Sequence, residues 1–256
     1  MLQLGLSIGA SAAAVIGAVW GLWKLGLHLW NSTAGRRRAQ AQILDQLACT
    51  MSRAFVENLL GEPRFIVGSP DGPDERFYRL RGAWIGIQFE GDAVDLLSIT
   101  ITDSRLWYRT GGMTLGVVDL RLGRDNFAES NDRFDHEQTW MGNKQAGYYR
   151  HYHFGGAGGN HQHFWLSYNA VGAGTLAGIN GPYSSDVDTG GIPPDPAKIT
   201  ANTLTILSPY GRLGDNLRRR ELFGPHIETV QLAWSERKQI QRQMAARVRL
   251  PRLPGP

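Results

Sequence analysis

The hydrophobic pattern divides the chain into a long apolar run, one amphipathic stretch and a series of short strand-like segments. The run covers residues 1–30 and has no charged side chain before Lys24. A helix needs about 20 apolar residues to cross the hydrocarbon core of a bilayer. Trp20, Trp23 and Trp30 gather toward the end of the run, where amphipathic rings favour the headgroup level. The pattern predicts a transmembrane helix over residues 1–30.

The amphipathic stretch follows at residues 39–60, where an apolar side chain recurs at every fourth position. This spacing is typical of one face of a helix. The repeat consists of Ile43, Leu47, Met51, Phe55 and Leu59. Gly61 then supplies a helix stop and Pro63 prevents continuation. We expect a linking helix within residues 31–60, between the membrane and a domain.

The next part of the chain alternates apolar and polar residues with the period of two that marks β-strands. The strand-like segments are residues 76–80, 83–90, 93–102, 147–154, 161–170 and 202–209. Gly91 and Asp92 predict a hairpin turn between the second and the third. Within the second, Ile85, Ile87 and Phe89 share one face, which we expect to point into the core. Trp84 lies on the opposite face.

Two further segments have turn and loop character. Residues 120–130 read as a strand end, a glycine turn and a short helical turn, whereas the glycine- and proline-rich residues 171–201 read as a long loop. Hairpins in place of alternating strands and helices imply an antiparallel sheet. The predicted fold class is therefore α+β: a single N-terminal transmembrane helix followed by a soluble antiparallel-sheet domain with few helices.

These patterns predict four parts of the chain. Residues 1–30 form a transmembrane anchor, residues 31–60 a juxtamembrane linking helix, residues 61–235 the α+β domain and residues 236–256 a basic tail. The composition fits a globular domain, with 42% hydrophobic and 20% charged residues. Cys49 is the only cysteine, so no disulfide can form within the chain.

The formal charge is +4, and the positive residues are clustered. Arginine triplets stand at residues 36–38 and 218–220, and the tail carries six basic residues against Glu236 alone. Basic runs attract phosphate. Beside a membrane anchor, anionic lipid is the expected partner. No aromatic residues interleave with the tail and no nucleic-acid-binding motif occurs, so the sequence does not favour nucleic acid.

The same charges predict the orientation of the anchor. Lys and Arg flanking a span are retained in the cytoplasm, and the arginines of residues 36–38 lie on its C-terminal flank. We therefore expect a bacterial inner-membrane protein, single-pass, with the bulk of the chain cytoplasmic. A cleaved signal peptide ending among the small residues 32–35 is the alternative, and it would put the domain in the periplasm.

Small residues form a stripe along the predicted span. The stripe consists of Gly5, Gly9, Ala13, Gly17 and Gly21, four residues apart. Such stripes let two membrane helices approach closely, which favours a homo-oligomer or a partner membrane helix. The plainer interpretation is that glycine and alanine are common in membrane helices.

Four histidines stand out in HYHFGGAGGNHQHF, residues 151–164. Alternation puts His151 and His153 on one face of their strand, and His161 and His163 on one face of theirs. With the glycine-rich stretch as the turn, we expect His153 opposite His161, and His151 opposite His163. Neutral imidazoles that close could hold zinc or copper. His136 could add a fifth group.

The alternative is a hairpin with an apolar face, carrying Tyr152, Phe154, Phe164 and Leu166, and a solvated face that carries the histidines. Neither a H-E-x-x-H motif nor a pair of C-x-x-C motifs occurs. A glycine pattern at Gly172, Gly174 and Ala177 lacks the helix that a dinucleotide site needs. Asp186, Asp188 and Asp195 lack the spacing of a calcium loop.

Several short motifs, taken together, resemble an uncharacterised bacterial family of membrane-anchored proteins of unknown function. They are LLGEPRF with its G-x-P turn, FYRLRGAWIGIQFEGDAVDLLSITITD, LRLGRDNF, the aromatic hairpin of residues 148–172 and ANTLTI, within residues 50–210. The resemblance implies a membrane-tethered domain and no catalytic residues. The histidines depart from it, because the family hairpin carries mainly tyrosine and phenylalanine.

The leading functional hypothesis is a single-pass membrane-anchored protein with a non-catalytic binding or assembly domain and no cofactor. The first alternative is a histidine-rich metal-binding protein or metal-dependent enzyme that uses zinc or copper at residues 151–163. The second is a periplasmic envelope structural factor.

Overall fold

The computed structural model describes most of the chain between residues 35 and 230. The described residues are 35–69, 72–106, 108–130, 133–141, 146–155, 162–179, 181–185, 191–211, 223–227, 229 and 230. The chain divides into two units, Met1–Gln42 and Ile43–Pro256, and the β-sheet belongs to the second.

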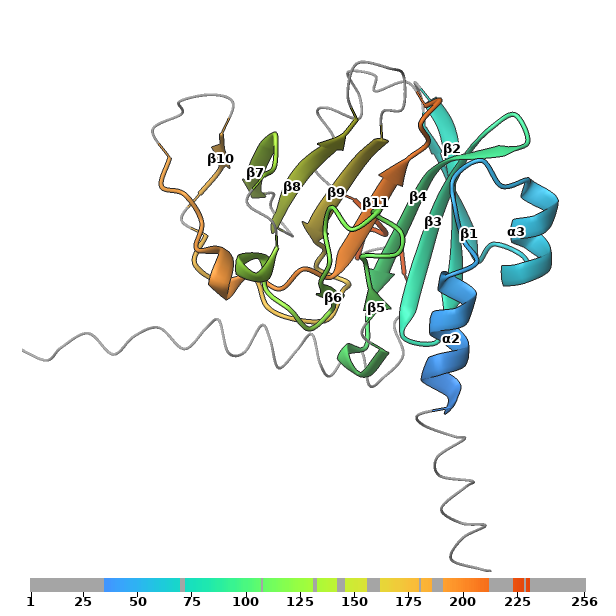
Figure 1. Cartoon of the computed structure of the whole chain (residues 1–256), viewed down its shortest axis with the longest axis horizontal. Helices are drawn as coiled ribbons and strands as arrows, with labels where there is room; N and C mark the ends of the chain where they lie inside the picture. The colour runs from blue at the N-terminus through green and yellow to red at the C-terminus, as the bar shows by residue number, and fades with distance from the viewer. Residues whose placement is uncertain are drawn as a thin grey trace, which may run out of the picture. The chain divides into compact units, whose positions relative to one another are not determined.

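The second unit is built on a nine-stranded sheet in the order β1-β2-β3-β4-β11-β9-β8-β7-β10, with every pair of neighbours antiparallel (Figure 1). Its strands are β1 (Phe65–Ser69), β2 (Gly72–Leu80), β3 (Ala83–Glu90), β4 (Ala93–Ile101), β7 (His136–Met141), β8 (Ala146–Phe154), β9 (Gln162–Tyr168), β10 (Tyr183–Ser184) and β11 (Thr203–Leu207). The other elements are α2 (Arg36–Leu44), α3 (Arg53–Leu60), the 3₁₀ turns η2 (Ser104–Leu106), η3 (Phe127–Glu129) and η4 (Pro196–Lys198), and the short ribbon of β5 (Tyr108–Arg109) and β6 (Arg121–Leu122). The structure thus confirms an antiparallel sheet with few helices.

The last strand joins two halves of the sheet. Strands β1 to β4 follow one another as a meander, and β7 to β9 form a second one. β11 lies between them, with Thr203 opposite Thr100 of β4 on one side and Ser167 of β9 on the other. All five residues of β11 are buried.

Both faces of the central strands are buried, and the two faces differ in chemistry. One face, which we call the aliphatic face, is lined by Ile85, Ile87, Leu97, Ile99, Phe164, Leu166, Leu204 and Ile206. The opposite one, the hydroxyl face, carries Ser98, Thr100, Ser167, Thr203 and Thr205, all at most 3% exposed. Strand alternation is as predicted, but Trp84 on the hydroxyl face is as buried as its neighbours on the aliphatic face.

A buried ion pair fixes η3 to the aliphatic face. Arg150, on β8, places Nε 3.2 Å from Oε2 of Glu137, and the two side chains are only 5% and 11% exposed. The same guanidinium donates to the carbonyl oxygen of Phe127 and to Oγ of Ser130. Burial raises the pKa of Tyr148, so its phenol keeps its proton and donates to Glu137. These bonds pair both buried charges and tie residues 127–130 to the sheet.

The predicted continuous helix over residues 39–60 is wrong. α2 ends at Leu44, and α3 begins at Arg53 behind the N-cap Ser52, whose hydroxyl accepts a bond from the amide of Phe55. Between the helices, Thr50 takes a positive φ of 71° and its amide donates to the carbonyl oxygen of Val94, at the start of β4. Pairing with a strand that is distant in sequence overrides the spacing-of-four pattern. The predicted end at Gly61 is confirmed.

Other strand predictions are confirmed with small changes, while the loop prediction for residues 171–201 is only partly right. Residues 83–90 form β3, and Gly91 takes a φ of 60° in the hairpin turn that follows. The sequence pattern did not identify β1 or β7. The supposed loop contains β10 and η4, and its two ends pair through a bridge between Leu176 and Ile199.

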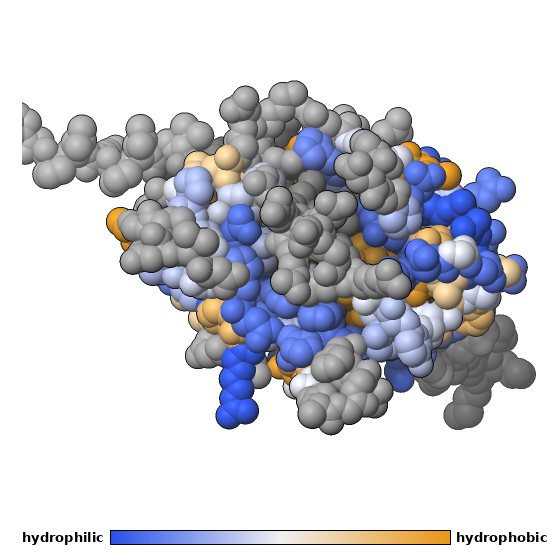
Figure 2. All heavy atoms as spheres, turned by 90° about the horizontal axis from the view of Figure 1, so that it is seen from above, coloured by the Kyte–Doolittle hydropathy of each residue, from blue (hydrophilic) through white to orange (hydrophobic). Residues whose placement is uncertain are grey.

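The two predicted anchoring features lie outside the described residues. These are the membrane span of residues 1–30 and the basic tail of residues 236–256. Of the helices that the structure describes, none combines the length and the apolar character needed to cross a bilayer. Figure 2 shows the described residues of one side of the molecule as mostly hydrophilic, with the hydrophobic ones in small, separate patches.

Cys49 should be unreactive in the folded protein. Its thiol lies 3.6 Å from the carbonyl oxygen of Ile206 and 3.9 Å from that of Asp95. Burial first, and the charge of Asp95 second, raise the pKa of Cys49 from 9.0 to about 12. Since only the thiolate reacts, we expect alkylation by iodoacetamide at pH 8 to be roughly a thousandfold slower than for an ordinary thiol. Mass spectrometry of the native and the urea-unfolded chain measures the difference. Rapid labelling of the native chain would contradict a part-buried thiol with a raised pKa.

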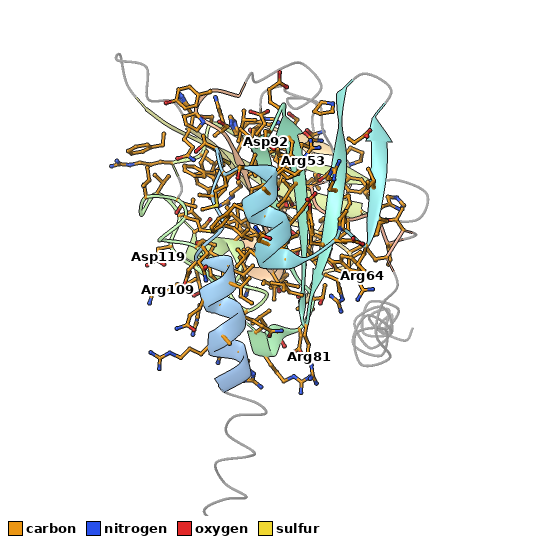
Figure 3. The ribbon with its side chains drawn as sticks, turned by 90° about the vertical axis from the view of Figure 1, so that its right-hand side faces the viewer. Arg53, Arg64, Arg81, Asp92, Arg109 and Asp119 are labelled. Carbon is orange, nitrogen blue, oxygen red and sulfur yellow. The ribbon has the colours of Figure 1, made fainter. Side chains whose placement is uncertain are left out.

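Arg150→Met should destabilise the domain strongly, because it leaves the Glu137 carboxylate buried without its cation. Removing one partner of a buried pair costs roughly 3–5 kcal/mol of unfolding free energy. The matched control is Arg109→Met, because Arg109 pairs with Asp119 at 2.8 Å while the two side chains are 70% and 42% exposed (Figure 3). Exposed pairs contribute about 0–1 kcal/mol. Urea unfolding of both variants tests the contrast, and equal losses would refute it.

Candidate functional site on the hydroxyl face of the sheet

The candidate site is the hydroxyl face, where three neighbouring strands place five hydroxyl groups in a compact group. Thr203 donates to Oγ1 of Thr100 at 2.9 Å, and Thr205 donates to Oγ of Ser98 at 3.1 Å. The fifth hydroxyl belongs to Ser167, opposite Thr203 in the sheet. Buried hydroxyls normally find partners, and these two cross-strand pairs satisfy four of the five.

Two buried polar atoms on this face have no hydrogen-bond partner among the described residues. They are Oγ of Ser167 and Nε1 of Trp84. Each belongs to a side chain that is at most 3% exposed. A buried donor without a partner costs about 1–3 kcal/mol, so such atoms point to a place where a water or a ligand group fits.

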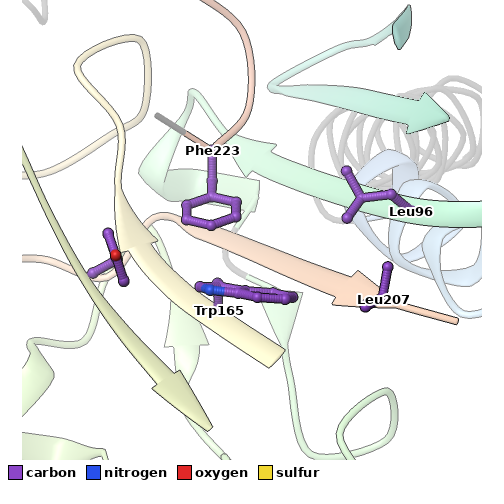
Figure 4. Packing of buried hydrophobic residues seen from close by; sticks show 5 residues of the cluster. Leu96, Trp165, Leu207 and Phe223 are labelled. Carbon is purple, nitrogen blue, oxygen red and sulfur yellow. The ribbon is translucent and has the colours of Figure 1, made fainter. Parts of the chain in front are cut away.

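Two apolar clusters flank the hydroxyls. One contains Leu96, Tyr149, Trp165, Leu207 and Phe223 (Figure 4). The other contains Phe77, Trp84, Val171 and Val230, with Phe65 and Ile227 packed against it. Hydroxyl groups flanked by two apolar clusters can bind a segment that has both apolar side chains and main-chain hydrogen-bonding groups.

Residues 223–230 belong to both clusters. Phe223 lies in the first, where its ring stacks on Trp165 with centroids 5.2 Å apart and meets Tyr149 edge-on at 5.4 Å. Ile227 and Val230 lie in the second. Gly224, between these contacts, sits against Thr100. A segment from near the end of the chain therefore crosses the hydroxyl face.

Two asparagines hold this segment and the sheet together. Asn169 donates through Nδ2 to the carbonyl oxygens of Phe223 at 2.7 Å and Pro225 at 3.1 Å. Its own amide donates to Oδ1 of Asn202, which precedes β11. Asn202 returns a bond from Nδ2 to the carbonyl oxygen of Asn169. The side-chain amide of Asn169 is therefore oriented by the sheet and presents two donors to the crossing segment.

The histidine hairpin lies on the same face, but its predicted register is wrong. His153 pairs with His163 and His151 with Trp165, which is a shift of two residues from the expected pairing. Phe154 and Gln162 are the last pair among the described residues of the hairpin. An even shift keeps every side chain on its face. Hence the predicted shared face is confirmed for His151, His153 and His163, although the predicted partners are wrong.

The imidazoles form a continuous series of rings. Nε2 of His151 lies 2.9 Å from Nδ1 of His163, and the two rings are within 13° of parallel. His163 also stacks on His153 with centroids 4.7 Å apart, and His151 stacks on Trp165 at 4.8 Å. His136 is opposite His151 in the sheet, and Oδ2 of Asp135 lies 3.9 Å from Nδ1 of His151. The series thus runs from the hairpin to the first aromatic cluster.

The structure brings together three of the four predicted metal candidates, His151, His153 and His163. His161 lies outside the described residues, as do the small-residue positions Gly5, Gly9, Ala13, Gly17 and Gly21. In the part of the chain that the structure describes, no three side chains of His, Cys, Asp or Glu are placed to hold a metal ion. The bond between His151 and His163 uses one nitrogen of each ring.

The glycine pattern near residue 172 has a packing role. A Cβ on Gly172 would overlap the side chain of Asn202, and one on Gly174 would overlap Thr200. Gly174 also takes a φ of 107°, which favours glycine. These glycines let the turn after β9 approach the start of β11 closely. Asp186 and Asp188 lie outside the described residues.

Sequence reasoning missed the hydroxyl face, although a signal was present. SITIT in β4 and TLTIL in β11 place a hydroxyl at every second position. Alternation of this kind ordinarily marks a solvated face. Only the placement of β11 beside β4, with residues 223–230 across both, reveals that these hydroxyls are buried together.

Comparison with known proteins assigns neither family nor function. No family model and no curated protein matches the chain. A solved structure that matches is described as the crystal structure of an extracellular protein containing a SCP domain from Bacillus anthracis str. Ames, with 11% sequence identity and a TM-score of 0.34. The match covers 79% of this chain and 59% of that one, so the chain spans well under two thirds of its length. A likeness this weak carries no argument about this protein.

Proposed function

We propose that the chain is a single-pass membrane-anchored protein whose sheet domain binds a partner and does no chemistry. One observation carries the binding half of the proposal. The hydroxyl face holds residues 223–225 by aromatic packing and by side-chain bonds to their main chain, as a sheet face would hold a peptide ligand. The membrane half rests on the apolar run of residues 1–30 and its aromatic flank.

Exposed basic residues of the sheet domain support a location of this domain beside anionic lipid. Asp45, just after α2, accepts a bond of 2.7 Å from the phenol of Tyr108. The turn before β3 carries exposed Arg81, and the segment after β4 carries exposed Arg105 and Arg109. Arg81 and Arg109 are labelled in Figure 3. Arg105 and Arg109 pair with exposed or half-exposed aspartates, and such pairs exchange readily with other anions. Lipid phosphate is an anion of that kind.

The arginines of residues 36–38 support the orientation, since basic residues beside a span stay in the cytoplasm. The proposal therefore places the sheet domain on the cytoplasmic side of a bacterial inner membrane. Helix pairing through the small-residue stripe would add a homo-oligomer or a partner membrane helix. A periplasmic envelope structural factor is the alternative that opposite orientation would support.

Membrane fractionation tests the anchor and its orientation. We expect the full chain to stay in the membrane pellet after alkaline carbonate washing, whereas a chain that begins at Arg36 should leave it, because about 20 apolar residues in a helix are needed to hold a protein in the bilayer. Protease added to inverted vesicles should digest the domain, and protease added to spheroplasts should not. Release of the full chain would refute the anchor. The reverse protease result would support the periplasmic alternative.

A second candidate function is metal binding by the hairpin, using zinc or copper. It is favoured by the direct contact of His151 with His163 and by the stacking of His153 on the latter. Neutral imidazole nitrogens are ligands for both metals. A binding domain and a metal-binding hairpin could coexist, because the metal would use the imidazoles, whereas residues 223–225 are held by Trp165 and Asn169.

Metal analysis of the untagged full chain tests this candidate. After incubation with excess zinc or copper and desalting, metal binding predicts about one equivalent per chain in the parent, and none in a variant with His151→Ala and His163→Ala. His226→Ala, outside the hairpin, is the matched control and should keep the metal. A parent chain that emerges without metal would rule the candidate out.

A further inference from the structure

The residues 223–225 are bound to the sheet in the manner of a short peptide ligand. Phe223 is 2% exposed and packs in one cluster with Trp165, Tyr149, Leu96 and Leu207 (Figure 4). Its contact with Trp165 is a stack, and its contact with Tyr149 is an edge-to-face pair. Well-packed aromatic anchors dominate the binding energy of protein interfaces.

The side chain of Asn169 binds the main chain of the segment at two points. Asn169 donates to the carbonyl oxygens of Phe223 and Pro225. The orientation of Asn169 does not depend on the segment, because Oδ1 of Asn169 accepts from the amide of Val171 and the Asn169 backbone is paired with Asn202. The recognition group therefore stays in position when the segment leaves.

The middle position of the segment admits only glycine. Gly224 takes a φ of 84°, and a Cβ there would overlap the Oγ1 of Thr100 and come within 3.1 Å of Nδ2 of Asn169. The site thus discriminates at two consecutive positions, which need an aromatic ring and a glycine, and at the third position it binds a main-chain carbonyl oxygen. Proline occupies the third position here.

The segment adds no strand to the sheet. The described residues 223–227, 229 and 230 form no ladder pairing, and Phe223 and Pro225 are joined to the residue after β9 through the side chain of Asn169. Segments held without ladder bonds open more readily than central strands such as β11. The segment can therefore leave its site while the sheet stays folded.

We propose that this part of the hydroxyl face is a recognition groove for an aromatic–glycine–proline peptide of a partner protein, occupied in cis by residues 223–225. The inference deepens the proposed binding function and rests on it. Because the internal segment is tethered to its own site, its effective concentration there is high. A partner must displace it, so the resting protein binds weakly and a partner with such a segment binds by exchange.

Peptide binding to the full chain in detergent tests the groove. The probe is a fluorescein-labelled peptide ELFGPHIETV, which repeats residues 221–230, and its control has alanine in place of phenylalanine. Phe223→Ala removes the internal ring from its cluster, so we expect this variant to bind the probe at least about tenfold more tightly than the parent chain. Ile192→Ala, at an exposed side chain outside both clusters, is the matched control and should leave the probe affinity unchanged. The alanine peptide should bind none of the three proteins.

Amide hydrogen exchange of the parent chain provides a second measurement, independent of any variant. Residues 223–227 should exchange through local opening, well before β11 does. Exchange of both only through global unfolding would overturn the proposal, and so would a folded Phe223→Ala variant that binds the probe no better than the alanine peptide. Either failure leaves the membrane anchor to be judged by carbonate washing, so the two proposals fail separately.

Discussion

The insertion of β11 between β4 and β9 is the constraint on which the rest of the domain depends. It pairs with a strand about a hundred positions earlier in the chain, and without it the two meanders share no edge. Bringing such distant segments together costs loop-closure entropy, which the new contacts must offset. Asn202 contributes at the entry to β11, because it bonds Asn169, Ala173 and Thr203 through its side chain. A fully bonded buried amide fixes one register, since a shift would leave several polar groups unpaired.

Because β11 is buried on both faces, the hydroxyl groups that it carries on the hydroxyl face need hydrogen-bond partners inside the protein. Thr203 and Thr205 cannot reach bulk water, so each donates to a hydroxyl of β4. The hydroxyls then need a cover, which residues 223–230 help to form, with Gly224 placed directly on Thr100. The groove and the centre of the fold therefore share residues. A partner that replaces the crossing segment would have to keep the same hydroxyls dry, and this requirement favours a ligand with the chemistry of the segment itself.

The sequence correctly predicted the elements that local contacts determine, and it failed for the elements that depend on pairing between distant segments. Residues 83–102 were predicted correctly because alternation and Gly91 fix a hairpin without outside help. The helix over residues 39–60 was wrong because residues near Thr50 pair with Val94. The face of the hairpin on which the histidines lie could be predicted, because it depends only on alternation along each strand. Their cross-strand partners could not be predicted, because these depend on a turn whose length the pattern does not define. The hydroxyl face could not be predicted, because nothing near SITIT indicates that TLTIL will lie beside it.

The ring series makes the hairpin and the groove parts of one packing system. His153, His163, His151, Trp165 and Phe223 follow one another in contact, with Trp165 touching both the imidazole of His151 and the ring of Phe223. If Phe223 leaves, Trp165 loses a stacking partner, and the imidazoles of His151 and His163 and the rest of the cluster must hold its ring. A ligand bound at His151 would change the stacking of its imidazole on Trp165. Coupling between two sites is reciprocal in free energy. A hairpin ligand that tightens Trp165 therefore favours the internal segment, and an occupant of the groove that packs on Trp165 as Phe223 does stabilises the histidine contact in return.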